Sequence, residues 1–386
     1  MTADALAADR VQAIFERNFT RGAEVGASVA VWQDGRQALC LCQGWKDFAR
    51  KAPWTQDTMV LVWSATKGLS SACVLHALEA SGRDLSTRVS EFWPEFAQSG
   101  KEDIRVGEVV SHRAGLSALT DKTASLRDYD AVIRAIELQA PLWEGRDEHG
   151  YSPRIYGYIA DEFVRRLSGK PLGEYWRANF GEPMDLDLWI GLPESLHHRV
   201  AQMLAARSSC GDSEDEFSQA MATPGSLTQE AFSTPAGMIS PSAMNSPGLR
   251  SASLPALGAI GSADSLAKFY AMLSLEGEWK GRRYFSTEAR HWMTSRLAQG
   301  IDKTLRTETA FSAGFMLDPL DASGRKKRYI FGPSLSAFGH PGAGGSLAFA
   351  DPENRIGFAY VMNQMESGVL PKSRAIALVH ALYDFP

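Results

Sequence analysis

The chain has 386 residues, of which 44% are hydrophobic and 22% are charged, a balance typical of a globular protein. This composition excludes disorder, collagen and coiled coil as the dominant state, and the length suggests roughly two or three structural units. Forty basic and 45 acidic residues leave a formal charge of −5, which gives no electrostatic case for a nucleic-acid partner or an anionic membrane surface.

The start of the sequence lacks the features of an export signal. Residues 1–10 carry acids where a signal peptide carries bases, and no apolar segment follows them. The longest uncharged run, Ala231 to Leu249, holds three prolines and is typical of a loop, so no membrane span is expected. Four cysteines in a chain of this length do not form a disulfide framework. We therefore expect a reduced, cytoplasmic protein without a membrane partner.

The first 84 residues predict a helix, a hairpin and a second helix. Apolar residues recur at helical spacing from Val11 to Phe19. Two strand-like runs, 27–32 and 38–43, flank the turn Gln33-Asp34-Gly35 and predict a β-hairpin. A short apolar run ending at Trp63 leads into a helix over 64–81, with Gly82 in the position that ends helices. This helix is apolar nearly all round, so we expect it to be buried.

The middle of the chain predicts helices and one long irregular segment. Residues 85–192 read as helical segments joined by loops. The segment Thr223 to Pro255 holds five prolines with many small residues, which predicts an irregular loop of the kind that is often functional. A helix is predicted over 262–276, with Asp264 as a good N-cap.

The last third predicts strands and a closing helix. The expected strands cover 311–317, 328–331, 346–350 and 356–363, the last two forming a hairpin, and a helix follows over 371–383. Strands at both ends with helices between them indicate an α/β domain built from residues 1–84 and 256–386. A mainly helical domain, 85–255, is expected to be inserted in it.

Three S-x-x-K patterns are the first chemical candidates: Ser64/Lys67, Ser265/Lys268 and Ser323/Lys326. Ser323 and Lys326 lie in a basic turn that we expect to be solvated, and Ser265 opens a helix that reads as structural. Ser64 alone stands where an apolar run meets a buried helix, with Lys67 on the same helical face. A buried lysine is costly unless something uses or pairs it. The nucleophile elbow, zinc, P-loop and C-x-x-C patterns are absent, and the adjacent His197 and His198 are expected on a solvated face.

Four segments in order resemble the serine β-lactamase and penicillin-binding-protein superfamily. They are Ser64-Ala65-Thr66-Lys67, Ser111-His112-Arg113-Ala114-Gly115-Leu116, Trp143-Glu144-Gly145 with Tyr151-Ser152, and His340-Pro341-Gly342. The sequence is most similar to the class C β-lactamase-like branch, which includes the family VIII carboxylesterases. The resemblance covers about residue 26 to the C-terminus. It implies an α/β (α+β) fold in which helices flank an antiparallel sheet and an all-helical domain is inserted.

The resemblance also implies the site. Ser64 would be the nucleophile, with Lys67 and Tyr151 as its catalytic partners, and the residues leave open which of the two takes the proton. The backbone amides of Ser64 and Ala343 would form the oxyanion hole. We expect no metal and no cofactor.

Several further residues are expected to bind the substrate. They are His340, Gly342, Trp63 and Trp143, with the segment 223–255 as a source of apolar pocket walls.

Two departures from the family pattern bear on the substrate. Pro153 stands in place of the asparagine of the Y-x-N motif, and His340 stands in place of the lysine of K-T-G. An unperturbed histidine, with a pKa near 6.5, is mostly neutral at pH 7 and carries charge only at lower pH. A site without a fixed positive charge suits a neutral ester better than a carboxylate-bearing lactam.

The sequence therefore predicts a carboxylesterase for small, short-chain esters. A β-lactamase or D-alanyl peptidase is the first alternative, and an acyltransferase of the same fold is the second. A catalytically silent binding module is disfavoured because Ser64, Lys67 and Tyr151 are all present. The expected partner is a small-molecule ester, and the oligomeric state is not predicted.

Overall fold

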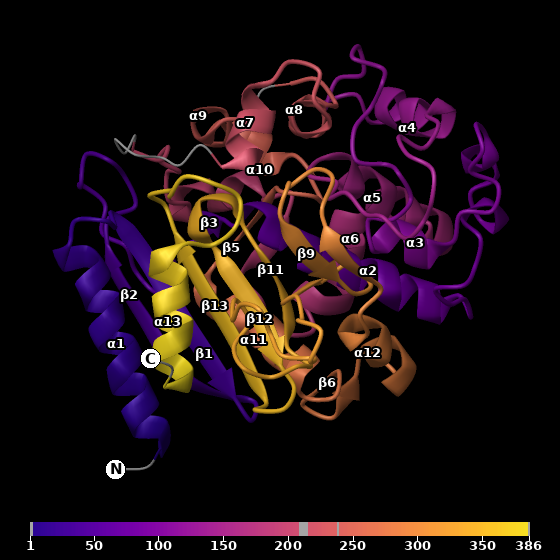
Figure 1. Cartoon of the computed structure of the whole chain (residues 1–386). Helices are drawn as coiled ribbons and strands as arrows, with labels where there is room; N and C mark the ends of the chain where they lie inside the picture. The colour runs from indigo at the N-terminus through magenta and orange to yellow at the C-terminus, as the bar shows by residue number, and fades with distance from the viewer. Residues whose placement is uncertain (1–2, 208–214, 238, 385–386) are drawn as a thin grey trace.

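A computed structural model describes residues 3–207, 215–237 and 239–384 (Figure 1). Its centre is an eight-stranded sheet in which every neighbouring pair is antiparallel, in the order β2-β1-β13-β12-β11-β10-β9-β8. The strands are β1 (Gly26–Gln33), β2 (Arg36–Gly44), β8 (Ala298–Ile301), β9 (Glu308–Phe311), β10 (Met316–Leu317), β11 (Phe338–Pro341), β12 (Leu347–Asp351) and β13 (Ile356–Met362). The predicted hairpins, β1–β2 and β12–β13, are confirmed and lie together because β1 pairs with β13.

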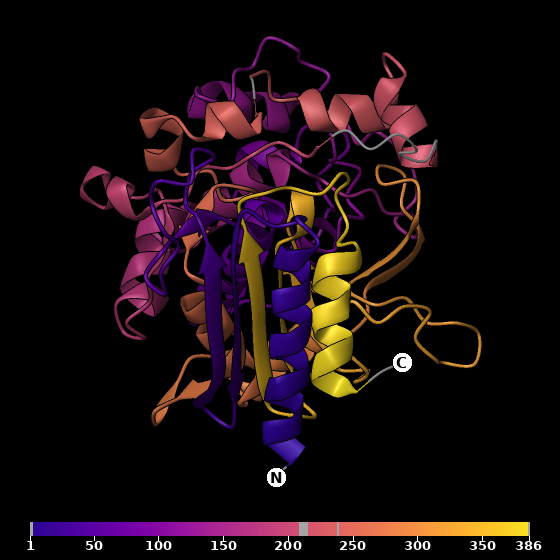
Figure 2. The same ribbon diagram turned by 90° about the vertical axis from the view of Figure 1, so that its left-hand side faces the viewer.

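Helices cover both faces of this sheet. In β1, Val29 and Val31 pack into the core beneath α1 (Ala3–Thr20) and α13 (Ser373–Tyr383), whereas Ala30 joins the core on the side of α11 (Ala263–Ser274). This alternation follows the two-residue period of a strand. Figure 2 shows α1 and α13 side by side over the sheet. Gly357 in β13 lets α11 approach closely, since a Cβ there would lie 2.2 Å from the backbone nitrogen of Ala271.

The helical half is built around α2 (Thr66–Ala80), which is buried as predicted. It packs against α5 (Ile155–Ser168), and its small polar side chains find partners: Ser70 donates to the Pro255 carbonyl at 2.6 Å. The other helices are α3 (Val106–Val110), α4 (Tyr129–Leu138), α6 (Leu172–Trp176), α7 (Glu216–Ala222), α8 (Leu227–Ser233), α9 (Pro241–Met244), α10 (Pro247–Ser251) and α12 (Thr287–Thr294). Among the described residues, no helix combines the length and apolar character needed to cross a membrane.

A second, three-stranded sheet connects the helical half to the rest. Its order is β3-β5-β4, formed by β3 (Val60–Leu61), β5 (Ala259–Gly261) and β4 (Leu188–Ile190). A two-stranded hairpin, β6 (Glu278–Trp279) with β7 (Arg282–Arg283), lies apart from both sheets. The division into domains 1–84 with 256–386 and 85–255 stays a prediction, and β4 pairs across its boundary.

The segment 223–255 differs from the sequence expectation because it contains three short helices, α8, α9 and α10. Ser226 and Ser240 cap the first two, accepting hydrogen bonds from the amides of Gln229 and Ala243. Pro241 and Pro247, which led to the prediction of a loop, instead lie in the first turn of α9 and α10. A proline is tolerated there because the N–H that it lacks would have no partner within the helix.

Two further predictions are wrong: the N-cap assigned to α11, and the solvation expected for the turn from Ser323 to Lys326. The N-cap of α11 is Ser262, and the Asp264 carboxylate instead accepts hydrogen bonds from the side chains of Trp32 and Gln37. Lys326 is buried and not solvated, because it pairs with Asp318 at 3.0 Å.

The strand predictions near the C-terminus need three corrections. The run 311–317 is divided between β9 and β10 by a tight turn in which the Ser312 amide donates to the Phe315 carbonyl. Residues 328–331 form no strand, since the amides of Ile330 and Phe331 donate to the Asp318 carboxylate at 3.1 Å. Strand β11, which contains His340, was not predicted as a strand.

Candidate active site

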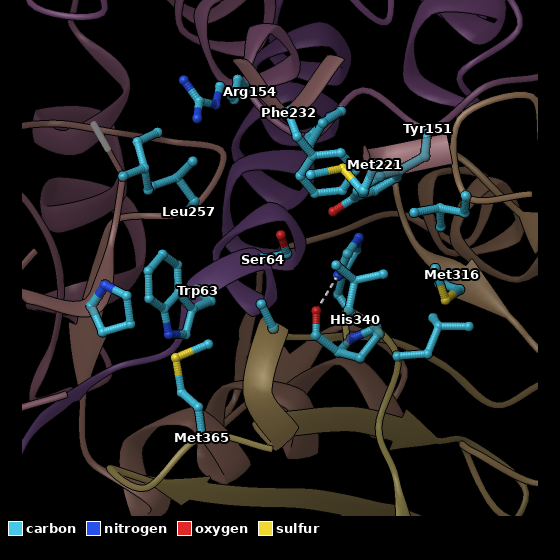
Figure 3. A pocket seen from close by; sticks show the side chains of 18 residues that line it. Trp63, Ser64, Tyr151, Arg154, Met221, Phe232, Leu257, Met316, His340 and Met365 are labelled. Atoms are coloured by element: carbon cyan, nitrogen blue, oxygen red, sulfur yellow. Dashed lines mark hydrogen bonds between the residues drawn. The ribbon is translucent and has the colours of Figure 1, made fainter. Parts of the chain in front are cut away.

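A cavity of about 360 Å³ lies where the start of α2, the turn before α5 and the end of β11 meet. Ser64, Tyr151 and His340 all line it (Figure 3). Most of the remaining wall is apolar. It includes Trp63, Phe232, Ile239, Leu257, Met316 and Met365.

Ser64 occupies a sharp turn between β3 and α2. The residue before it, Trp63, has φ of 51°, a left-handed conformation that is strained for a bulky side chain. Thr66 holds this turn, because its hydroxyl donates to the Trp63 carbonyl at 2.5 Å and accepts from the Ala259 amide at 2.9 Å. The turn aims the Ser64 side chain into the cavity (Figure 3).

Lys67 is fully buried one turn further along, and its ammonium nitrogen meets neutral groups. Its Nζ lies 3.4 Å from the Ser64 hydroxyl and donates to the carbonyls of Pro153 at 3.0 Å and Ala256 at 2.9 Å. Burial holds the pKa of Lys67 well below its usual value. The backbone carbonyl of Pro153 thus supplies a hydrogen-bond acceptor at the position where the asparagine side chain of the family motif is missing.

Tyr151 lies against Lys67, whose Nζ is 4.7 Å from the centre of the tyrosine ring. Burial raises the pKa of Tyr151, and its hydrogen bond with Ser64 opposes that shift. The Tyr151 amide donates to both carboxylate oxygens of Asp302, at 3.0 and 3.1 Å, which fixes the backbone behind the ring. The shifts of Lys67 and Tyr151 both favour the uncharged forms, an amine and a phenol.

His340 lies on β11 with its ring 5.9 Å from that of Tyr151. Its Nδ1 is 2.7 Å from the Pro341 carbonyl, so Nδ1 carries the proton and Nε2 presents a lone pair. Burial is the largest cause that lowers the pKa of His340, to about 3. The expectation that this histidine gains charge as the pH falls below 6.5 is therefore wrong, because its surroundings exclude the water that would stabilise the charge.

Gly342 brings the end of β11 against the strand that leads to Ser64. A Cβ at Gly342 would lie 2.2 Å from the Val62 carbonyl oxygen, so only glycine allows this approach. Ala343, the next residue, lines the cavity. Within the described part of the chain, no hydrogen bond starts from the amide of Ser64 or of Ala343. Both amides are free for a substrate oxygen, as the predicted oxyanion hole requires.

The structure places Trp63 in the cavity wall but Trp143 outside it. The Trp143 ring covers Gly150, where a Cβ would lie 2.8 Å from it, and Lys303 Nζ is 5.9 Å from the ring centre. The substrate-binding role predicted for Trp143 is therefore not supported, because the ring closes the outer side of the Tyr151 segment.

Sequence reasoning missed Arg154, Asp302 and the individual apolar wall residues. Arg154 follows the Tyr151 motif directly, and that position was the available signal for it. Asp302 and Phe232 belong to no pattern, and only the fold brings them here. In the described ranges, no group of three or more His, Cys, Asp or Glu side chains is arranged to hold a metal ion.

Comparisons with known proteins agree with this geometry. A model of the beta-lactamase family matches residues 11–382. The esterase/beta-lactamase LipL of Mycobacterium tuberculosis is 29% identical over 369 residues, which cover 91% of this chain and 80% of that protein. A penicillin-binding protein homolog from Caulobacter crescentus superposes with a TM-score of 0.87 at 31% identity, over 98% of this chain and 97% of that one. A family VIII carboxylesterase superposes with a TM-score of 0.86 at 32% identity, with the same two coverages of 98% and 97%.

Proposed function

The chain belongs to the beta-lactamase family and is a serine hydrolase of the β-lactamase and penicillin-binding-protein superfamily, and from this premise we propose that it hydrolyses small neutral carboxylic esters through an acyl-enzyme on Ser64. The observation that carries the proposal is the contact of Ser64 with Lys67 at 3.4 Å, at one side of an apolar cavity. The family VIII carboxylesterase and the esterase/beta-lactamase among the similar proteins support ester chemistry.

In this proposal Lys67 is the base that activates Ser64. Its hydrogen bonds run to neutral acceptors, and burial favours the free amine, so it can take the hydroxyl proton near neutral pH. Tyr151 stays protonated, because burial raises its pKa. This assigns the proton acceptor that the sequence left open.

The reaction then proceeds in two balanced halves. Ser64 Oγ attacks the ester carbonyl carbon as its proton passes to Lys67, and the oxyanion accepts hydrogen bonds from the amides of Ser64 and Ala343. The bond to the alkoxide breaks as the Tyr151 hydroxyl gives it a proton and Lys67 restores that proton. Water repeats the sequence on the acyl-enzyme, releasing the acid and Ser64.

The preference for esters follows from the charges around the cavity. His340 is neutral, with a pKa of about 3, and Arg154 is the one ionised side chain among the described lining residues. Arg154 lies apart from Ser64 (Figure 3), and its Nη1 already donates to three backbone carbonyls, so a substrate carboxylate beside Ser64 would lose its hydration without a cation next to it. β-Lactam hydrolysis is the second candidate, favoured by the similarity to an esterase/beta-lactamase.

The test combines labelling with a substrate panel. A fluorophosphonate should form an adduct on Ser64, located by mass spectrometry, and Ser64→Ala should abolish both labelling and p-nitrophenyl ester hydrolysis. Ser265→Ala is the matched control, since Ser265 begins the second S-x-x-K pattern in a structural helix. An adduct on another serine, or nitrocefin turnover at pH 8 as efficient as ester turnover, would overturn the proposal.

A further inference from the structure

Arg154 connects the Tyr151 turn, residues 151–153, to a loop far along the chain. It directly follows Pro153, whose carbonyl accepts from Lys67, and it is the N-cap residue of α5. Its Nη1 donates to the carbonyls of Ser233 at 3.2 Å, Pro235 at 2.9 Å and Gly237 at 3.1 Å. One nitrogen thus binds three alternate residues of what we call the 233–237 loop.

The charge of Arg154 has no carboxylate to balance it. Arg154 forms no ion pair with any residue of the described ranges, and burial lowers its pKa to about 10, so it stays cationic at neutral pH. The carbonyl dipoles of the loop are what compensate the charge. Arg154 is half-buried, and a cation that has lost part of its hydration needs polar groups around it, so this arrangement favours one loop position over others.

Residues on both sides of the 233–237 loop form part of the cavity wall. Phe232 precedes it, and Ile239 and Pro241 follow it, and all three line the cavity. Other bonds hold its outer side: the Leu119 amide donates to Thr234 Oγ1, and the Ala236 amide donates to the Ala124 carbonyl, each at 2.8 Å. These bonds attach the loop to residues 119–124, whereas those of Arg154 attach it to the Tyr151 turn.

We propose that Arg154 is a positioning residue that sets acyl-chain selectivity, by holding the Phe232, Ile239 and Pro241 wall at a fixed distance from Ser64. The inference rests on the proposed esterase function and deepens it. The cavity of about 360 Å³ is roughly twelve times the volume share of a water molecule, far more than an acetyl group needs. A longer acyl chain on Ser64 has more methylenes to pack against this wall than an acetyl group has. Figure 3 shows Arg154 set apart from Ser64 and His340, as this indirect role requires.

The consequence is a preference, among uncharged esters, for acyl chains long enough to pack against this wall over acetyl. Each methylene that packs against a fixed wall contributes about 0.8 kcal/mol, which is close to fourfold in kcat/KM. Without the Arg154 bonds the wall no longer holds that position, and the gain per methylene is lost while acetyl transfer continues.

The experiment compares p-nitrophenyl acetate, butyrate and hexanoate for the wild type, Arg154→Met and Arg154→Lys. We expect the hexanoate-to-acetate ratio of kcat/KM to fall at least tenfold in Arg154→Met, mainly through KM of the longer ester. Arg154→Lys keeps the charge but has a shorter, single-headed donor, so it should recover only part of the ratio. Arg127→Met is the matched control, because Arg127 is a nearby exposed arginine outside the cavity.

Three outcomes would overturn the inference. Equal losses on all three esters in both Arg154 variants would mean a general structural role. An unchanged ratio in folded protein would mean that the bonds do not set the wall. A selective loss on a carboxylate-bearing ester, p-nitrophenyl hemisuccinate, would make Arg154 an anion-binding residue. The proposed function fails separately, if wild-type protein does not hydrolyse the acetate ester at all.

Discussion

At the scale of single residues, Lys67 and Tyr151 are coupled by their positions. The lysine Nζ lies 4.7 Å from the tyrosine ring centre, and both side chains meet Ser64. Residues that act as a unit lose most of their effect when either one is removed. We therefore predict that Lys67→Ala and Tyr151→Phe each lower kcat by about 10³ or more, and that the double variant is little worse than the poorer single one. Single-turnover and steady-state rates on one ester measure this, and additive losses would contradict the coupling.

His340 gives a second prediction, on pH dependence. With a pKa of about 3 it is neutral at pH 6 and at pH 8, so lowering the pH brings no positive charge to the cavity. Nitrocefin hydrolysis should therefore be no more efficient relative to ester hydrolysis at pH 6 than at pH 8. Burial would hold a lysine at this position toward its neutral form, as it does Lys67, so His340→Lys should raise kcat/KM for nitrocefin by less than the roughly tenfold to a hundredfold of a charge-assisted hydrogen bond. A relative gain for wild-type nitrocefin turnover at pH 6 would show that His340 protonates in the site.

Some residues of the site could be predicted from the sequence, and others could not. Ser64, Lys67 and Tyr151 could be proposed from the sequence because the chemistry proposed for them requires fixed residue types at a recognisable spacing. Arg154 is not, because its partners are backbone carbonyls some 80 positions away, and a carbonyl leaves no mark in the sequence. The role predicted for Trp143 lacks support for a related reason, since an aromatic next to a motif can face either side of it, and this ring lies outside the cavity.

At the scale of elements, the same limit explains which strands were predicted. The hairpins β1–β2 and β12–β13 were predicted because apolar runs lie on either side of a polar turn. Strand β11 is short and rich in residues that suggest a loop, and it is a strand because β12 and β10 pair with it on both sides. The strand predicted at 328–331 has suitable apolar residues, but it does not form because the amides of Ile330 and Phe331 donate to the Asp318 carboxylate.

The contact between β11 and β3 gives a prediction at this scale. Gly342→Ala would place a methyl group 2.2 Å from the Val62 carbonyl oxygen, so β11 must move away from the turn that holds Ser64. The amides of Ala343 and Ser64 would then separate, and the loss of one oxyanion donor costs about 10² to 10³ in kcat. Gly248→Ala is the matched control, because no atom lies within 4 Å of its Cβ position.

The measurement is kcat for one p-nitrophenyl ester, with circular dichroism to establish that the variants are folded. We expect a fall in kcat for Gly342→Ala with a smaller change in KM, and no change for Gly248→Ala. Wild-type kcat in folded Gly342→Ala would mean that the approach of β11 does not position the oxyanion donors.

At the scale of the whole molecule, folding gathers polar side chains from distant parts of the chain and buries them away from the water that would stabilise their charge. His112, His149 and His340 come from three distant segments, and each is buried. Burial lowers the pKa of all three histidines, and it lowers that of His340 to about 3. Folding therefore keeps these rings neutral at a pH where the unfolded chain would protonate them.

Because these histidines are neutral in the folded state, their contribution to the free energy of unfolding decreases as the pH falls. An unfolded histidine protonates below about pH 6.5, so between that pH and the folded pKa of about 3 the unfolded state binds more protons. Stability from His340 is thus nearly complete at pH 7.5 and is lost as the pH falls, by about 1 to 2 kcal/mol at pH 5.5 and about 3 kcal/mol at pH 4.5. Buried acids such as Glu24, whose pKa burial raises to about 7, act in the opposite direction, so only a comparison of variants isolates the histidine.

We predict that His340→Gln reduces the loss of unfolding free energy between pH 7.5 and pH 4.5 by about 3 kcal/mol relative to the wild type, because glutamine cannot protonate in the unfolded state. His198→Gln is the matched control, because it makes the same substitution at an exposed histidine. Urea unfolding at pH 7.5, 6.5, 5.5 and 4.5 gives both differences. Parallel curves for His340→Gln and the wild type would mean that His340 accepts a proton inside the folded protein, and the uncharged His340 on which the ester preference rests would then be wrong as well.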